Sequence, residues 1–371
     1  MKLPTFVLER WQSTWENRVD INLSESGVHP LTVGELQALT GDDDLFATLL
    51  GYGQTNGSER LREHIAALYE GAAPTHVSVT NGGAEANFVA LWELVLPGAP
   101  VVMLLPTYMQ GHGLARAFGA RLREVWLREE RGWQPDPEEI EEAAGDDARV
   151  IVVTNPGNPT GTALSEDARA AVLRAAERSG AWILADEVYA GAELEGDVTA
   201  SFWGAAERVV CTGSLSKAYG LPGLRMGWAV APEELAERLW ARTDYTTIAP
   251  SVLSDRLASD ALRPDVRPRI LARTRAILRR NLPVVRRWVD ATPGLSLHPP
   301  VAGAIAYVGY TGGPDSDELA ARILEETSVL VVPGSQFGMG RYLRIGYGIG
   351  EAELEEGLGR VGEVLATVGV G

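Results

Sequence analysis

The chain has 371 residues, of which 45% are hydrophobic and 22% charged, and its formal net charge is −17. This length and balance exclude a disordered chain and are enough for two domains. The negative charge disfavours nucleic acid and anionic membrane surfaces as partners. A single cysteine, Cys211, excludes an internal disulfide and a cysteine-based zinc site, and the five histidines lack metal-ligand spacing, so no metal is expected.

The N-terminal segment, residues 1–15, contains neither an apolar signal core nor a cleavage site. No apolar run approaches the ~20 residues that a membrane helix needs. We therefore expect a cytoplasmic protein with no membrane partner.

Short apolar runs alternate with helical patterns along the first two thirds of the chain. Continuous runs of Val, Ile and Leu are typical of strands buried on both faces. Strands are predicted at residues 76–80, 101–105, 121–127, 150–154, 182–185, 209–212 and 226–230, with helices at 137–144 and 165–179. This alternation predicts an α/β domain with a mostly parallel sheet.

The alternation stops after about residue 239. A long Arg-rich helix is predicted at 266–291, its arginines facing solvent, and prolines break the chain at 293–300. A smaller α+β region follows, with strands predicted at 305–308, 329–332 and 342–345 and a final helix from residue 351. We predict a large domain at 41–265 and a small domain formed by 1–40 with 266–371.

Lysine is rare in this chain. Of the 33 basic residues only Lys2, at the terminus, and Lys217, in mid-chain, are lysines. Arginine keeps its proton in a protein, whereas lysine can become a nucleophilic amine. Lys217 is therefore either a leftover surface lysine or a residue whose amine chemistry is required.

Two motifs follow predicted strands in the first half. Thr-Asn-Gly-Gly-Ala-Glu at 80–85 opens a helix, and its glycines and free N–H groups favour a phosphate, although an ordinary tight turn is the alternative. Asn-Pro-Gly-Asn-Pro-Thr-Gly at 155–161 lies at a strand's carboxyl end, where ligand sites of α/β proteins occur. Asp186 also ends a strand, where it could cap the chain or pair with a cationic ring nitrogen.

Further charged and hydroxyl side chains lie in the second half. Ser214 and Ser216 precede Lys217, and Arg225 follows it by eight residues, so these side chains either hold a phosphate or form a surface loop. Arg344 lies in an apolar strand, where a half-buried arginine needs an anionic partner, structural or from a substrate.

Taken in order, Asn-Pro-Thr-Gly, Asp-x-x-Tyr and Ser-x-Ser-Lys-(x)7-Arg resemble the class I/II aminotransferase family, from about Leu50 to the C-terminus. The resemblance implies fold type I: a large domain with a mixed, mostly parallel sheet flanked by helices, and a smaller α+β domain. It also implies pyridoxal 5′-phosphate (PLP) as cofactor and a homodimer with shared active sites. The expected reaction is ping-pong transfer of an α-amino group from an L-amino acid to a 2-oxo acid.

The resemblance also implies roles for residues around the cofactor ring. Lys217 would form a Schiff base with the cofactor, and its freed amine, with a lowered pKa, would then move the proton at Cα. Asp186 would pair with the pyridinium nitrogen. Asn158, in a cis peptide and beside the substrate, and Tyr189 would contact the 3-oxygen, while Tyr108 would stack on the ring.

The remaining roles concern the phosphate and the substrate. Arg344 would bind the substrate α-carboxylate, and Tyr52 would reach the phosphate of the neighbouring subunit. The other expected phosphate-binding residues are Gly83, Ala84, Ser214, Ser216 and Arg225.

The N-terminal segment departs from the Gly-x-Pro stretch of many relatives. Residues 22–29 read Asn-Leu-Ser-Glu-Ser-Gly-Val-His, which is similar to the Ser-Gly-Val-His stretch of the capreomycidine synthases, PLP enzymes that cyclise a hydroxyarginine. On this hypothesis Gly27 and Val28 line the substrate site. Glu25 could meet a basic side chain, although a solvated acid is the favoured interpretation. An eliminase or cyclase acting on an arginine-like amino acid is thus the alternative function, and a non-catalytic binding module is disfavoured.

Overall fold

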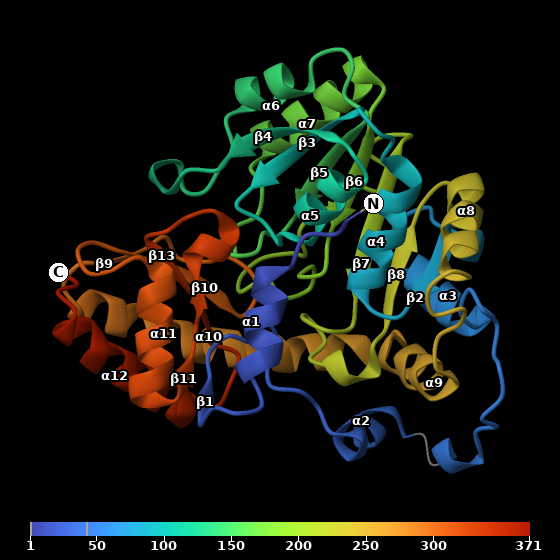
Figure 1. Ribbon diagram of the computed structural model, residues 1–371. Coiled ribbons are helices and arrows are strands. Elements are labelled where there is room, and N and C mark those ends of the chain that lie inside the picture. Colours follow the sequence, from blue (N-terminus) through green and yellow to red (C-terminus); the bar gives the residue numbers. More distant parts are fainter. Residues whose placement is uncertain (1, 42–43) are drawn as a thin grey trace.

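The computed structural model describes residues 2–41 and 44–371, which build two main sheets. Figure 1 shows the larger sheet with helices on both faces, and the smaller sheet beside it against α11 (Ser316–Thr327) and α12 (Glu351–Thr367). The protein is therefore an α/β molecule in which two layered units adjoin.

The large sheet has seven strands in the order β2-β8-β7-β6-β5-β3-β4. Its bounds confirm the predicted strands to within about two residues: β2 (Val77–Thr80), β3 (Pro100–Leu105), β4 (Arg121–Trp126), β5 (Val150–Thr154), β6 (Trp182–Asp186), β7 (Val209–Ser214) and β8 (Gly227–Val230). β8 is antiparallel to both of its neighbours, and the other pairs are parallel. The predicted mixed, mostly parallel sheet is confirmed.

Both faces of the large sheet are buried. Val102 and Leu104 of β3 belong to one hydrophobic core, while Val101, Met103 and Leu105 belong to the other. Alternate side chains of a strand point to opposite faces, which explains the continuous apolar runs. The covering helices are α3 (Glu59–Ala66), α4 (Gly83–Leu94), α5 (Gln110–Ala117), α6 (Pro137–Ala144), α7 (Glu166–Ser179) and α8 (Glu233–Thr243), and α9 (Val252–Ala261) packs against α3.

The small sheet has the order β12-β13-β10-β9. Its strands are β9 (Leu295–Leu297), β10 (Ile305–Tyr310), β12 (Val332–Pro333) and β13 (Tyr342–Gly346), and β11 (Val329–Leu330) pairs elsewhere. β9 lies within the segment that was predicted to be a proline-rich break. It forms a strand there because its backbone pairs with β10, although prolines flank it.

The long helix α10 (Arg267–Ala291) confirms the predicted helix, but not all its arginines face solvent. Arg275 donates to the Gly191 carbonyl, and Arg279 donates to the Leu194 carbonyl. These bonds attach α10 to the segment after β6. The interpretation of a solvated face was wrong for the half-buried Arg275, whereas the side chain of Arg279 is exposed as expected.

The N-terminal segment packs on the small sheet through α1 (Val7–Trp15) and β1 (Ile21–Asn22), and α2 (Val33–Thr40) follows. β1 pairs with β11, and the Trp11 indole donates to the Val331 carbonyl at 2.9 Å. These contacts support the division into 41–265 and 1–40 with 266–371, which stays a prediction.

Short 3₁₀ turns complete the secondary structure: η1 (Leu45–Ala47), η2 (Pro74–His76), η3 (Glu129–Arg131), η4 (Pro222–Leu224) and η5 (Gly334–Phe337). Across residues 2–41 and 44–371, no helix combines the length and apolar character needed to cross a membrane.

Candidate active site

A cavity of about 470 Å³ lies at the carboxyl ends of the parallel strands. Thr154, Asp186 and Ser214, the last residues of β5, β6 and β7, all line it. Ligands of α/β sheets bind at this edge because loops, rather than covering helices, surround it. α1 and β13 contribute further lining residues from the other part of the molecule.

One corner of the cavity is built to receive an anion. Gly82, at φ +87°, precedes α4, and a Cβ there would lie 2.4 Å from Arg225 Nη2. The positive φ of Gly82 favours glycine at this turn, and the helix start lies close to this guanidinium, which adds to the positive end of the helix dipole. The Ser216 N–H donates to Ser214 Oγ at 3.2 Å. The structure brings together all five predicted phosphate-binding residues of this chain: Gly83, Ala84, Ser214, Ser216 and Arg225.

Asp186 is held in a fixed orientation. Its Oδ2 accepts from Asn87 Nδ2 at 2.8 Å, and its Oδ1 accepts from the Val188 N–H at 3.2 Å. Burial raises the pKa of the carboxyl, although both donors oppose the shift. Among the described residues Asp186 forms no ion pair. A cationic ring nitrogen would therefore supply the positive partner that this buried carboxylate lacks.

Asn87 is a site residue that the sequence interpretation missed. Its Oδ1 accepts from Thr212 Oγ1 at 2.7 Å, which fixes the amide that donates to Asp186. Asn87 follows Gly83 by four residues, so both lie on one face of α4. That helical spacing from the glycine motif is the signal that could have found it.

Arg344 confirms the expectation of a buried arginine in an apolar strand. It is 1% exposed in β13, where Nη1 donates to Asn158 Oδ1 at 3.1 Å and Nη2 donates to the Ser24 carbonyl at 2.6 Å. Burial lowers the pKa of the guanidinium, but an arginine stays charged in a protein. Both of these acceptors are neutral, and although Glu25 and Glu9 lie near enough to act on its charge, Arg344 forms no ion pair among the described residues, so it can bind a carboxylate. The Asn158–Pro159 peptide is cis, as the resemblance implies.

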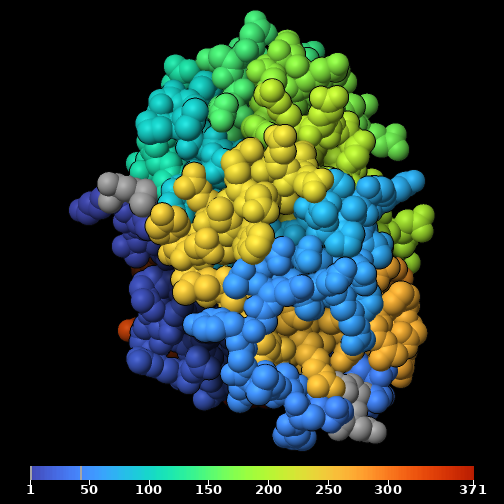
Figure 2. Space-filling view, turned by 90° about the vertical axis from the view of Figure 1, so that its right-hand side faces the viewer, coloured from blue at the N-terminus to red at the C-terminus, as the bar shows by residue number. Residues whose placement is uncertain are grey.

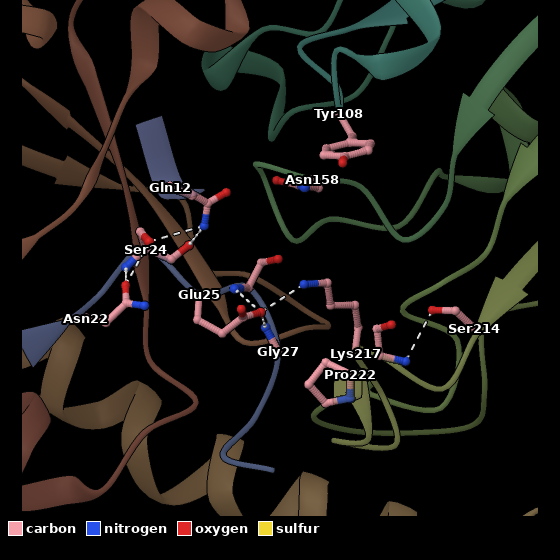
Figure 3. Close-up of polar contacts among 12 residues, drawn as sticks. Gln12, Asn22, Ser24, Glu25, Gly27, Tyr108, Asn158, Ser214, Lys217 and Pro222 are labelled. Carbon is pink, nitrogen blue, oxygen red and sulfur yellow. Dashed lines mark hydrogen bonds and ion pairs between the residues drawn. The ribbon is translucent and has the colours of Figure 1, made fainter. Parts of the chain in front are cut away.

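Lys217 forms an ion pair with Glu25 that the sequence did not predict. Its Nζ donates to Glu25 Oε1 at 2.8 Å, and the same oxygen accepts from the N–H groups of Ser26 and Gly27 at 2.8 and 2.9 Å. Figure 3 shows the amine pointing at this carboxylate, with Tyr108 and Asn158 above them in that view. The interpretation of Glu25 as a solvated acid was therefore wrong.

This ion pair shifts both pKa values. The Lys217 ammonium lowers the pKa of Glu25 to about 2, although burial opposes the change. Burial lowers the pKa of Lys217, but the charge of Glu25 and the neighbouring Tyr189 outweigh it, so the net shift is upward. The Glu25 contact, which the sequence pattern did not include, thus acts against the lowering that is expected for the pKa of the freed amine.

The other predicted site residues differ in position. Tyr108 and Tyr189 line the cavity, and a Cβ at Gly27 would lie 3.5 Å from Lys217 Cδ. Val28 is 2% exposed in the hydrophobic core and does not line the cavity, because its side chain packs against Gly220. Tyr52 is 87% exposed and lies outside the cavity of its own chain.

The N-terminal helix forms a wall of the cavity that no motif predicted. Glu9, Gln12 and Glu16 of this segment follow an i, i+3, i+7 spacing and all line the cavity. The Tyr108 hydroxyl donates to Glu9 Oε1 at 2.6 Å. Burial raises the pKa of Glu16, and the negative charges of Glu25 and Glu9 raise it further. The wall is therefore acidic, and this helical spacing is the signal that could have found it.

Comparisons with known proteins agree with this geometry. The family model described as aminotransferase class I and II matches residues 30–361. The chain is 36% identical to capreomycidine synthase from Streptomyces vinaceus over 98% of this chain and 95% of that protein. It is 28% identical to an aspartate aminotransferase from Streptomyces avermitilis, over 85% and 81% of the two chains.

Two solved structures are similar over nearly the whole chain. One is a PLP-dependent aminotransferase from Streptococcus suis, with a TM-score of 0.93, 31% identity and 99% coverage of both chains. The other is the PLP-dependent cyclase OrfR in complex with Au, with a TM-score of 0.91, 29% identity and coverage of 99% and 98%.

The residues present fit PLP. The start of α4 at Gly82 and Gly83, beside Arg225, suits a phosphate. The amine of Lys217 suits an aldehyde, and the buried Asp186 suits a protonated ring nitrogen. The chain is an enzyme that belongs to the class I and II aminotransferase family, whose cofactor is pyridoxal 5′-phosphate.

Proposed function

We propose that this enzyme acts at Cα of an L-amino acid with a cationic side chain, and that it eliminates or cyclises its substrate as capreomycidine synthases do. The observation that carries the proposal is the acidic wall, formed by Glu9, Gln12 and Glu16 on one face of the N-terminal segment. The whole-chain similarity to capreomycidine synthase supports it independently.

The charges in the cavity suit such a substrate at both ends. Arg344, held by Asn158 and the Ser24 carbonyl, would bind the α-carboxylate. Glu9 and Glu16 form no ion pair within residues 2–41 and 44–371. Partly buried carboxylates without a cation favour one from the ligand, and a guanidinium can bind two oxygens at once.

The catalytic roles are proposed for residues whose side chains line the cavity. When bound, PLP supplies an electron sink for the charge left at Cα. Lys217 is the one lysine among the described residues that lines the cavity, and it would carry a proton to and from Cα. Asp186, oriented by Asn87, would stabilise positive charge at the far end of the cofactor site.

We also propose a homodimer with shared active sites. Figure 2 shows the face on which residues near 45–60, in blue, adjoin α8 and α9, in yellow. Apolar side chains exposed on residues 45–60 include Phe46, Leu49, Leu50 and Tyr52, and the exposed Tyr245 lies between α8 and α9. Such a patch is typical of a surface that a partner covers. A second copy placed there would let Tyr52 reach the partner's phosphate corner, as the resemblance implies.

The substrate class is tested by titrating the cofactor-loaded enzyme with L-arginine and with L-citrulline while following cofactor absorbance. Citrulline keeps the shape of arginine but replaces its guanidinium with an uncharged group. Charged hydrogen bonds contribute about 1.5–3 kcal/mol, so arginine should half-saturate at a concentration at least about 10-fold lower. Equal half-saturation would refute a cationic subsite.

Transamination is the second candidate, because the family match and the aspartate aminotransferase relative favour it. When no 2-oxo acid is present, the two reactions differ in the number of turnovers that the enzyme completes. Transamination stops after one turnover with the amino group on the cofactor, whereas elimination continues. With 3-hydroxy-L-arginine as substrate, we expect repeated turnover in the absence of any 2-oxo acid. A single turnover would assign transamination instead.

A further inference from the structure

Glu25 is placed to act on the catalytic lysine itself. Of the acidic side chains that line the cavity, among the described residues, it alone touches the Lys217 amine, at 2.8 Å. The two residues are 192 positions apart in sequence, so the fold and not the local chain brings them together. Substrate recognition by the acidic wall does not account for this contact.

The carboxylate is held in place independently of the lysine. Oε1 of Glu25 accepts from two successive backbone N–H groups, those of Ser26 and Gly27. A Cβ at Gly27 would lie 3.1 Å from the Ser216 carbonyl and 3.5 Å from Lys217 Cδ. The absence of a side chain at Gly27 thus lets the turn pack against the stem of the lysine. The acceptor is preorganised for one position of the amine.

We propose that Glu25 is a positioning residue that receives the Lys217 amine, as an ammonium, whenever this amine is not bound to the cofactor. The inference rests on the proposed function only in that Lys217 carries the cofactor. It is independent of which amino acid the enzyme uses and of whether the reaction is transamination or elimination.

The groups around Lys217 determine whether removal of Glu25 favours the ammonium or the free amine. Glu25, Glu16 and the Tyr189 hydroxyl favour the ammonium, while burial and Arg344 oppose it. Because Glu25 is the contacting anion, its removal leaves burial and Arg344 to dominate. Neutralising Glu25 therefore converts the released lysine to a free base at lower pH.

The test measures the protonation of Lys217 directly. The cofactor-loaded enzyme is treated with aminooxyacetate, which captures the cofactor aldehyde and frees the lysine, and is then labelled with trace acetic anhydride across a pH series. Lys2, the other lysine of the chain, is the internal reference. In Glu25→Gln, which keeps an oxygen for the two N–H groups, we expect the labelling midpoint to fall by about one pH unit or more. That shift makes labelling below the midpoint about 10-fold faster.

Two further variants complete the test. Glu16→Gln removes a neighbouring carboxylate that does not touch the amine, and it should shift the midpoint less than Glu25→Gln does. Glu25→Asp keeps the charge but withdraws it by one methylene, so a partial shift is expected even where Glu25→Gln does not fold. An unchanged midpoint in the Glu25 variants, or an equal shift in Glu16→Gln, overturns the proposal. Failure of Lys217 to bind cofactor in the unaltered enzyme would instead refute the proposed function.

Discussion

Asn87 connects two buried polar groups that PLP binding would depend on. Its amide donates to Asp186 and accepts from Thr212. Asn87→Leu keeps the branched shape of the side chain but removes the donor, so the free carboxyl becomes harder to ionise. A lost bond to a charged group costs about 1.5–3 kcal/mol, so the dissociation constant for PLP should rise at least about 10-fold in a reconstitution titration.

Thr212→Val is the matched control for Asn87, since it removes only the outer hydrogen bond. It should weaken cofactor binding less than Asn87→Leu does. Unchanged affinity in Asn87→Leu would show that the orientation of Asp186 does not depend on this amide.

The Glu25–Lys217 pair predicts an acid-sensitive contribution to stability. The pKa of Glu25 is lowered from 4.5 to about 2, so its contribution is fully present above pH 4.5 and is lost as the pH falls toward 2. Thermal unfolding of the cofactor-free protein should therefore lose stability more steeply in this window than unfolding of Glu25→Gln. Parallel pH profiles for the two proteins would contradict the pairing.

At the scale of the element, the acidic wall on the N-terminal helix should determine substrate charge preference. The double variant Glu9→Gln/Glu16→Gln keeps the shape of the wall and removes its charge. We expect the preference for arginine over citrulline to fall at least about 10-fold, with citrulline binding little changed. Arg10→Gln, on the exposed side of α1, is the control and should keep the preference.

Local pattern predicted most strands and the glycine, Asn-Pro and Ser-x-Ser-Lys motifs, because each depends on neighbours in sequence. β5, for example, occupies Val150–Thr154 as predicted. β9 was missed because its pairing with β10, and not its composition, makes it a strand. Glu25 and Glu9 were misjudged or missed because their partners, Lys217 and Tyr108, lie far away along the chain.

At the scale of the whole molecule, the exposed apolar patch predicts dimerisation. Phe46 is 95% exposed and Leu50 is 77% exposed, so a charge at each should disrupt a buried contact. Phe46→Asp/Leu50→Asp should be a monomer by light scattering and should bind PLP more weakly, because Tyr52 is then absent from the partner's site. Val198→Asp, at an apolar residue 50% exposed elsewhere, should stay dimeric. A dimeric double variant would place the interface on another face.

The most direct measurement for the whole account is borohydride reduction of the cofactor-loaded enzyme, followed by peptide mapping. Because the chain has two lysines, the map has an internal control. We expect the phosphopyridoxyl group on the peptide that contains Lys217, with Lys2 unmodified. A map that leaves Lys217 unmodified would contradict it.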